Sequence, residues 1–381
     1  MKINYFYSSK INLFIKYLTD LVGYYCFNRN KSNLIIDFKR IKSIAIVNLG
    51  HIGDMILMLP MLDSLRRGFD GKITLIINPY VYELVEHFNM IDDIIVVDHP
   101  KVSRKNKSSW FNTVLTFNRL KFDLVFNADM LFYSIPLCYL IKCKYFIGYN
   151  AGGFGFLFDK VLEYPYGQHI TERYFRFIDY LNLVRIKPKK LDCYLKVNLS
   201  SYFLGFKKHY NIDGKFAVIA IGTGAQSKDW DDKNYIELLE KILFDLKIKV
   251  VLLGKINFNR EMYYKNSLKY FKDSCIVNLI NKTSIIEAIS LIYFSNFFIG
   301  LDSGLTHVAG MCGVKTFGIY SGMTGVGVWD PISLNNNVNI IKVEVPCNND
   351  GNGCGKTVCK NNICMKNIKP EMVYDFIIKN I

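Results

Sequence analysis

Three polar, glycine-containing segments each follow an apolar run and carry side chains suited to acid–base or phosphate chemistry. They are NLGHIGDM (48–55), GTGAQSKDW (222–230) and GLDSGLTHVAGMCG (300–313). In the first, Gly50 and Gly53 allow a tight turn and the close approach of a ligand. Asp54 then opens a helical stretch. It can act as a helix cap that satisfies free N–H groups, or as a base that takes a proton from an incoming hydroxyl. The local pattern leaves both interpretations open.

The second segment suits phosphate oxygens. Thr223 and Ser227 offer hydroxyl groups, Gly224 a flexible backbone, and Lys228 a mobile positive charge. The alternative is a solvated polar loop without a ligand.

The third segment ends a strand at Asp302 and Ser303 and turns at Gly304 into a helix that starts near Leu305. The free N–H groups and the dipole of a helix start bind anions. His307, in the first turn, can add a hydrogen bond or a positive charge to a diphosphate. The alternative is a cap with a packed histidine. None of the three segments is a GxGxxG fingerprint or a P-loop, so a dinucleotide-binding enzyme is poorly supported.

Short apolar runs alternate with helical patterns along the chain, which predicts parallel βαβ units covered on both faces. The sequence therefore predicts an α/β protein of two doubly wound domains, with ligands at the carboxyl ends of the strands. The expected strands are 43–48, 73–78, 94–98, 123–127, 145–148, 216–222, 249–254, 275–279, 297–300 and 315–320. The expected helices are 55–69, 131–142, 232–246, 284–295 and 305–312.

The chain is basic, with 48 Lys and Arg against 33 Asp and Glu and a formal net charge of +15. Such a charge attracts anionic partners. No recognition helix, zinc finger or RNP-like pattern accompanies it, so nucleic acid is not the expected partner.

Residues 11–28 form an apolar and aromatic stretch that Lys16 and Asp20 interrupt. It lacks the features of a signal peptide and of a membrane-spanning helix. The apolar residues at 14, 15, 18, 21 and 22 fit a helical stripe. We expect either a helix that lies on a membrane surface or one that packs on its own domain.

In order and spacing, the three segments resemble the ADP-heptose:lipopolysaccharide heptosyltransferase family, glycosyltransferase family 9. The resemblance runs from about residue 41 to the end and includes the Cys-containing stretch 346–377. It implies a GT-B fold of two Rossmann-like domains that face each other across a cleft. Residues 1–40 would be an extension, 41–200 the acceptor domain and 201–381 the donor domain, with a last helix able to pack back on the N-terminal domain.

The resemblance also implies an enzyme that moves a sugar, heptose by family default, from a nucleotide-diphosphate donor to lipopolysaccharide or a related anionic glycolipid. The transfer would invert the anomeric carbon without a metal or a cofactor. The enzyme would be cytoplasmic and peripheral on the inner membrane. Asp54 falls on the general-base position. The donor positions are Thr223, Lys228, Asp302, Ser303, Gly304 and His307. The alternatives are a GT-B epimerase or hydrolase and an inactive binding protein.

The acceptor side offers Gly53 and the segment 168–174, with His169 and Arg173, or else the basic stretch KVSRKNKSSW (101–110). Solvated basic surface is the alternative for both segments. Six scattered cysteines are typical of a reduced cytosolic protein. The other four, Cys347, Cys354, Cys359 and Cys364, are expected to be free or structural thiols. A zinc site or disulfides are the alternatives.

Overall fold

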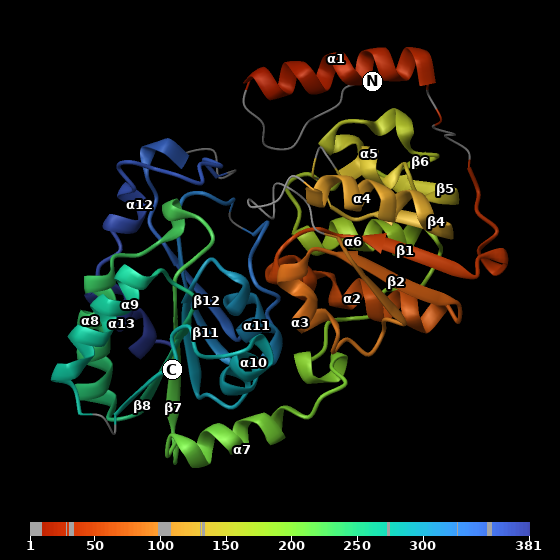
Figure 1. The fold of residues 1–381 in the computed structure, drawn as a ribbon. Coiled ribbons are helices and arrows are strands. Elements are labelled where there is room, and N and C mark those ends of the chain that lie inside the picture. The colour runs from red at the N-terminus through yellow and green to blue at the C-terminus, as the bar shows by residue number, and fades with distance from the viewer. Residues whose placement is uncertain are drawn as a thin grey trace. The chain divides into compact units, whose positions relative to one another are not determined.

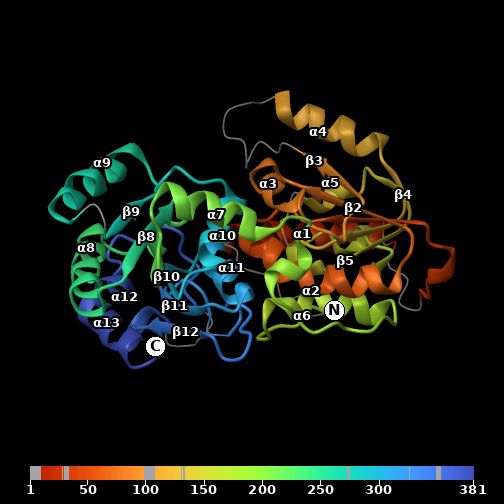
Figure 2. The same ribbon diagram turned by 90° about the horizontal axis from the view of Figure 1, so that it is seen from below.

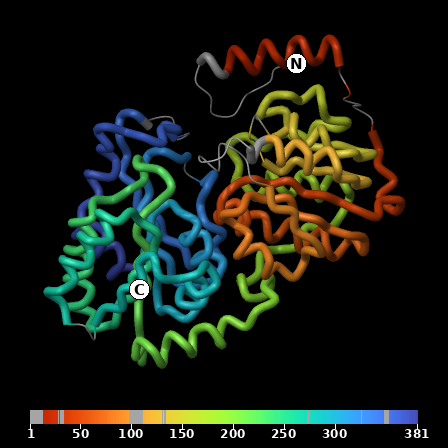
Figure 3. Tube along the Cα trace, in the orientation of Figure 1, coloured from red at the N-terminus to blue at the C-terminus, as the bar shows by residue number. Residues whose placement is uncertain are grey.

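The computed structural model describes residues 10–27, 29, 34–97, 108–129, 131, 134–272, 275–325, 327–348 and 353–381. The chain divides into two compact units, Met1–Lys187 and Pro188–Ile381. Figure 1 draws unit 1 from red to yellow-green and unit 2 from green to blue, and Figure 3 follows the same chain as a tube. None of the described helices is both long and apolar enough to cross a membrane.

Unit 1 contains a parallel six-stranded sheet in the order β3-β2-β1-β4-β5-β6. Its strands are β1 Ser43–Val47, β2 Lys72–Ile77, β3 Asp93–Val96, β4 Lys121–Asn127, β5 Lys142–Gly148 and β6 Lys160–Val161. The chain order reverses between β1 and β4, which places a topological switch point there. Val47 at the end of β1 pairs with Ile76 and with Asn127. The loops that follow β1, β2 and β4 therefore leave the sheet at one edge.

Helices cover both faces of this sheet (Figure 2). They are α2 Ile52–Gly68, α3 Tyr82–Val85, α4 Ser108–Arg119, α5 Ser134–Cys138 and α6 Ile170–Tyr180. Helix α1 Lys10–Phe27 packs instead against the short helical turn Gly155–Leu157. Phe126 of β4 stacks on Phe177 of α6, with ring centroids 4.1 Å apart. On the opposite face, Val125 shares a buried cluster with Phe117 of α4 and Ile135 of α5. Adjacent strand residues point to opposite faces, so an unbroken apolar strand serves both layers.

Unit 2 repeats the topology with the sheet order β12-β11-β10-β7-β8-β9. Its strands are β7 Phe216–Ile221, β8 Lys249–Gly254, β9 Ile276–Asn278, β10 Phe297–Leu301, β11 Lys315–Tyr320 and β12 Val338–Lys342. Its switch point lies between β7 and β10, which pair in parallel. The loops 222–230 and 302–304 follow these two strands.

The helices of unit 2 also lie on both faces of its sheet (Figure 1). They are α7 Leu199–His209, α8 Asp232–Lys241 with a π-helical turn at Ile242–Leu246, α9 Phe258–Ser267, α10 Ile285–Tyr293, α11 Gly304–Cys312, α12 Ile363–Lys366 and α13 Pro370–Ile378. The last helix, which was expected to be able to pack back on the N-terminal domain, contributes Val373 and Ile377 to the core of unit 2. The Trp230 indole N–H donates to the Ile368 carbonyl at 2.8 Å. This bond holds the segment that precedes α13.

The predicted strands are confirmed, with small differences at their ends, and so is the doubly wound α/β class. The helix predicted over 131–142 is wrong in extent. The described helix covers only Ser134–Cys138, because β5 already begins at Lys142, opposite Lys121 of β4. The sequence analysis missed both β6, an edge strand of two residues, and β12, an edge strand whose residues are all half-buried. Asn339 and Lys342 interrupt the apolar residues of β12, so its sequence is not a continuous apolar run.

Candidate active site

The candidate base, Asp54, is the third residue of α2, and His51 is the residue that precedes the helix. The His51 backbone N–H donates to Asp54 Oδ2 at 2.9 Å. Asp54 therefore caps the helix start from the third position rather than as the first residue. Its Oδ1 atom makes no hydrogen bond within the described part of the chain. The cap fixes one oxygen of a half-buried carboxylate and leaves the other available.

Gly50 provides the space that the Asp54 carboxylate occupies. A Cβ atom at Gly50 would lie 2.5 Å from Asp54 Oδ2 and 2.9 Å from Asn48 Oδ1. The Gly50 N–H in turn donates to Asn48 Oδ1 at 3.0 Å. The first glycine of the segment is thus required by side-chain packing, because any larger residue would displace the carboxylate. Gly53 lies in the first turn of α2 and is partly exposed.

Residues from two neighbouring strand ends hold the backbone of this loop. Asn78, after β2, donates its side-chain amide to the carbonyls of Leu49, at 2.9 Å, and Gly50. Asp129, after β4, accepts the Leu49 N–H through Oδ2 at 3.2 Å. The loop is therefore held through both its carbonyl and its amide groups, as expected at a switch point where these strand ends converge.

The sequence analysis did not identify Asp129, although a carboxylate shortly after a predicted strand is a usable signal. Its other oxygen accepts from the Leu131 N–H at 3.0 Å and from the Ser134 hydroxyl. Burial raises the pKa of the Asp129 carboxyl to about 6, although these hydrogen bonds and Arg173 lower it in part. Asp129 is consequently a second acidic group beside the Asp54 loop, and it titrates closer to neutrality than an ordinary aspartate.

Arg173 lies inside unit 1, with only 3% of its surface exposed. Its Nη2 donates to the Tyr174 hydroxyl at 2.6 Å, and the same hydroxyl accepts from Asn48 Nδ2 at 3.3 Å. Burial lowers the pKa of Arg173. The nearby Tyr174, Tyr164 and Asp54 raise this pKa by more than burial lowers it, so the net shift is upward. Asp54 and Arg173 are thus electrostatically coupled, and Asn48 links Arg173 to the loop.

The structure separates the two residues that the sequence grouped as acceptor candidates. His169 precedes α6, and its Nδ1 atom accepts the Thr171 N–H at 3.3 Å, so it caps the helix. Arg173 is one turn farther along the same helix and points into the unit. Residues 101–107 of the alternative basic stretch lie outside the described residues.

In unit 2, the switch point brings Lys228 and Asp302 together. Lys228 Nζ lies 2.8 Å from Asp302 Oδ2, and their side chains are 17% and 5% exposed. The Thr324 hydroxyl donates to the same Asp302 oxygen at 3.0 Å. The positive charge that the sequence suggested as mobile is therefore paired here with a buried carboxylate.

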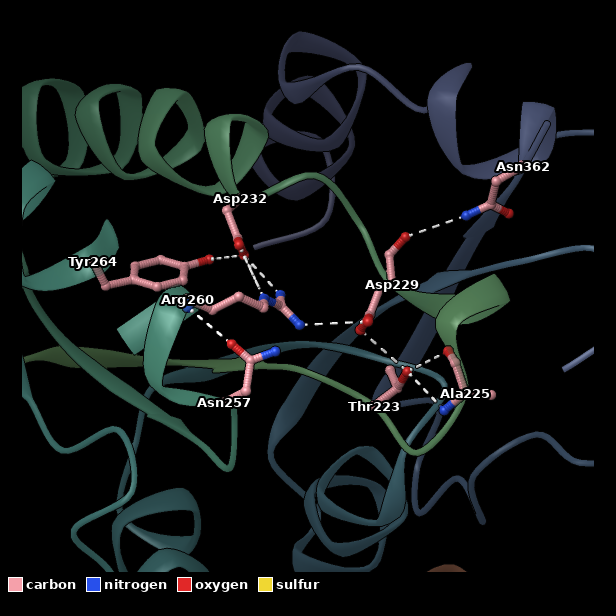
Figure 4. Close-up of polar contacts among 8 residues, drawn as sticks. All are labelled: Thr223, Ala225, Asp229, Asp232, Asn257, Arg260, Tyr264 and Asn362. Atoms are coloured by element: carbon pink, nitrogen blue, oxygen red, sulfur yellow. Dashed lines mark hydrogen bonds and ion pairs between the residues drawn. The ribbon is translucent and has the colours of Figure 1, made fainter. Parts of the chain in front are cut away.

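A polar network holds the loop that carries Lys228 (Figure 4). The Thr223 hydroxyl donates to the Ala225 carbonyl at 2.8 Å and contacts Asp229 Oδ1 at 3.2 Å. Arg260 of α9 lies 3.4 Å from Asp229 and makes a two-pronged contact with Asp232, at 2.6 and 2.9 Å. Thr223 thus stabilises the loop by contacts to other residues of the same loop. The first turns of α8 and α9 hold the loop through Arg260, which contacts Asp232 and Asp229.

The start of α11 supplies backbone donors beside Asp302. Ser303 precedes the helix without a side-chain cap, and Gly304 is its first residue. The first N–H groups of any helix lack partners within it and face the positive end of the helix dipole. His307 is buried. The helix start is therefore the part of this segment best suited to an anion.

The cysteine-containing segment 354–359 packs against the loop 222–230 and bonds Gly322. The Ser227 N–H donates to the Thr357 carbonyl at 3.1 Å, the Cys359 N–H to Gln226 Oε1 at 2.9 Å, and the Cys354 N–H to the Gly322 carbonyl at 2.9 Å. All ten cysteines are free thiols. Across the described ranges, no group of three or more His, Cys, Asp or Glu side chains could hold a metal.

Each unit therefore presents polar groups at its own switch point. Unit 1 presents a held carboxylate with a free oxygen, as a base requires. Unit 2 presents a lysine and a helix start, which stabilise a leaving diphosphate.

Comparisons with known proteins give a consistent result. A family model described as "Glycosyltransferase family 9 (heptosyltransferase)" matches residues 115–356. A curated lipooligosaccharide heptosyltransferase 2 from Campylobacter jejuni subsp. jejuni serotype O:6 is 24% identical over 324 residues, covering 79% of this chain and 93% of the relative.

Two solved structures cover most of the chain. The glycosyl transferase family 9 protein from Veillonella parvula aligns with a TM-score of 0.69 and 17% identity, over 92% of this chain and 98% of that one. The E. coli heptosyltransferase WaaC, solved with ADP, aligns with a TM-score of 0.67 and 16% identity, over 89% and 100%. At this identity the structures establish the fold alone, and they confirm the expected GT-B fold.

Proposed function

Because the chain belongs to glycosyltransferase family 9, we propose that this glycosyltransferase moves heptose from ADP-heptose to a lipooligosaccharide or lipopolysaccharide acceptor, with inversion at the anomeric carbon. The observation that carries the proposal is the Asp54 carboxylate, held by the His51 amide at the switch point of unit 1. The heptosyl donor and the acceptor class follow the names of the relatives, one of which was solved with ADP.

In the proposed reaction, Asp54 Oδ1 takes the proton of an acceptor hydroxyl while that oxygen attacks C1 of the sugar. The new C1–O bond forms as the bond from C1 to the diphosphate breaks, and ADP leaves with the bonding electrons. A single displacement of this kind inverts C1. An aligned base contributes on the order of 100- to 10,000-fold to the rate.

Negative charge grows on the departing diphosphate, and unit 2 supplies the groups that stabilise it. Lys228 can turn from Asp302 toward the phosphates, and the N–H groups at Ser303 and Gly304 point out of the start of α11. The backbone N–H groups are fixed before the reaction, so little reorganisation of these donors is needed. The proposed mechanism requires neither a metal nor a cofactor.

Arg173 is better placed to position the acceptor side than to touch the acceptor. It is buried, bonds Tyr174, and is coupled to Asp54. Direct acceptor contact is proposed for the exposed start of α2 around Gly53. The lipid of such an acceptor places the reaction at a membrane surface, and the proposed location remains the cytoplasmic face of the inner membrane.

The decisive experiment incubates the protein with ADP-heptose and a lipid-linked core acceptor and follows both substrates. Transfer with release of one ADP per product supports the proposal. Release of free heptose, or its epimerisation, without product would replace the proposal with a hydrolase or epimerase. Nucleotide binding without any turnover would indicate an inactive binding protein.

A further inference from the structure

Helix α1 exposes a continuous apolar face. Its exposed large side chains are Phe14, Ile15, Tyr17, Leu18, Leu21, Val22, Tyr25 and Phe27. The exposed fractions reach 66% for Phe14 and 93% for Tyr25. A contiguous exposed apolar surface of this kind marks an interaction site rather than ordinary protein surface.

The charged side chains of α1 that the structure describes face the protein instead of the solvent. Lys16 and Asp20 are the only charged residues between positions 13 and 27, and they are 8% and 2% exposed. Asp20 Oδ1 accepts the Phe154 backbone N–H at 2.7 Å. A surface helix of a soluble protein ordinarily turns its apolar stripe to the core. In α1 this arrangement is inverted.

The inverted orientation is fixed by close contacts with unit 1. Gly23 lies directly against the Phe156 ring, where a Cβ atom would come within 2.1 Å, and Tyr24 packs edge-on against the same ring. Beyond the helix, the Arg29 N–H donates to the Phe156 carbonyl at 3.0 Å, and its guanidinium lies 3.0 Å from Asp159. The side of the helix that carries Asp20 and Gly23 therefore faces unit 1, and its large apolar side chains are on the exposed side. Figures 1 and 3 show the course of the helix backbone along unit 1.

The charge of this part of the chain identifies the class of partner. Residues 1–42 contain eight Lys or Arg and two Asp or Glu, a net charge of +6 out of the +15 of the whole chain. Apolar and aromatic side chains on a helix within a basic segment are typical of helices that lie in the plane of an anionic membrane. The described helix is unsuited to crossing the bilayer, so it would lie on it.

We propose that the outer face of α1 binds an anionic lipid bilayer, with its apolar side chains in the boundary between headgroups and acyl chains. This inference deepens the proposed function, because it names the element by which unit 1 meets the membrane that carries the acceptor. Its geometric basis does not depend on which sugar is transferred.

The test is cosedimentation of the full-length protein with vesicles of phosphatidylcholine alone or with 30% phosphatidylglycerol. The test variant combines Phe14→Ser, Leu18→Ser and Leu21→Ser. The matched control combines Val184→Ser, Phe244→Ser and Tyr270→Ser, three exposed apolar residues outside α1. We expect the wild type and the control to bind anionic vesicles, and the α1 variant to bind at least tenfold more weakly. Binding of the wild type should also weaken with added salt.

Several outcomes would overturn the proposal. These are equal vesicle binding by all three proteins, no binding by the wild type, or loss of a dimer rather than of lipid binding in the α1 variant, as measured by light scattering. Transfer to a delipidated acceptor in detergent-free solution should be equal in the wild type and the α1 variant. If that transfer is absent from both while vesicle binding follows the expected pattern, the proposed function fails and the membrane inference stands.

Discussion

The Lys228 ammonium group lies 2.8 Å from the Asp302 carboxylate, and both belong to loops at the switch point of unit 2. The pair is largely buried, and Thr324 donates to the same carboxylate oxygen. In the proposed reaction, a diphosphate that binds Lys228 would share the lysine with Asp302 or draw it away. The ion pair holds the lysine in place before the donor binds, which lowers the conformational entropy lost on binding.

Replacing Lys228 with Met should weaken ADP binding by about 10- to 100-fold, because a charged hydrogen bond contributes roughly 1.5–3 kcal/mol. It should also lower the free energy of unfolding by about 3 kcal/mol, since the buried Asp302 carboxylate loses its cation. Calorimetry with ADP and denaturant unfolding measure the two effects.

The double variant Lys228→Met/Asp302→Asn separates these effects. It should recover most of the stability and none of the ADP affinity, because it removes the uncompensated charge without restoring the lysine. Lys233→Met, at an exposed position of α8, is the control and should change neither quantity. An ADP affinity that stays at the wild-type value in Lys228→Met would remove Lys228 from the donor site.

Asp54→Asn should reduce turnover by roughly 100- to 10,000-fold, because it removes the base. An asparagine oxygen can still accept the His51 N–H, so the free energy of unfolding and the ADP affinity should stay near the wild-type values. Turnover under saturating substrates, calorimetry and denaturant unfolding measure these quantities. Asp70→Asn, at an exposed site after α2, is the control. Near-normal turnover by Asp54→Asn would refute the assignment of the base.

Gly50→Ala should reduce kcat by about 10- to 100-fold, since a displacement of about 1 Å at a reacting group has an effect of this size. The new methyl group would lie 2.5 Å from Asp54 Oδ2 and would push the carboxylate aside. ADP affinity, which the proposed function assigns to unit 2, should not change. Gly205→Ala in α7 has no atom within 4 Å of the added Cβ and serves as the control. Equal kcat values for the two variants would show that the position of Asp54 does not limit the reaction.

The contribution of the Asp129 carboxyl to the free energy of unfolding should fall as the pH rises from about 4 to about 6. Burial raises the pKa of its carboxyl from 3.8 to about 6 in the folded state, so the folded state binds the proton more tightly than the unfolded state does. Its protonation therefore favours folding at low pH, by about 3 kcal/mol in total, and this contribution is lost as the pH passes through 6. Denaturant unfolding of the wild type and of Asp129→Asn across this range should show the wild type gaining relative stability toward pH 4.

Asp123 provides a comparison of opposite sign. The Lys144 side chain and the backbone N–H groups of Lys42 and Ser43 lower the pKa of the Asp123 carboxyl below 3.8. The stability it contributes is present above that value and is lost as the pH falls through the lower folded-state pKa. Relative to Asp123→Asn, the wild type should lose stability toward pH 3. Parallel pH profiles for the two variants would contradict the burial of Asp129.

The sequence by itself determined the strands other than the edge strands β6 and β12, the doubly wound class, the family and the segments that carry Asp54, Lys228 and Asp302. These features depend on local patterns: apolar runs that must be buried on both faces, and glycine-containing turns that follow them. The edge strand β12 and the short helix α5 were missed or misjudged, because neighbouring strands set their extent and burial.

Only the tertiary structure decided how side chains far apart in the sequence meet. The pairing of Lys228 with Asp302, the contact of Asp129 with the Leu49 amide and the burial of Arg173 depend on strand order. The orientation of α1 is the clearest case. Its sequence shows an apolar stripe, but the stripe faces outward because Asp20 and Gly23 fit the surface formed by residues 154–156. Which face of a helix is buried depends on its neighbour, and a local pattern does not contain that neighbour.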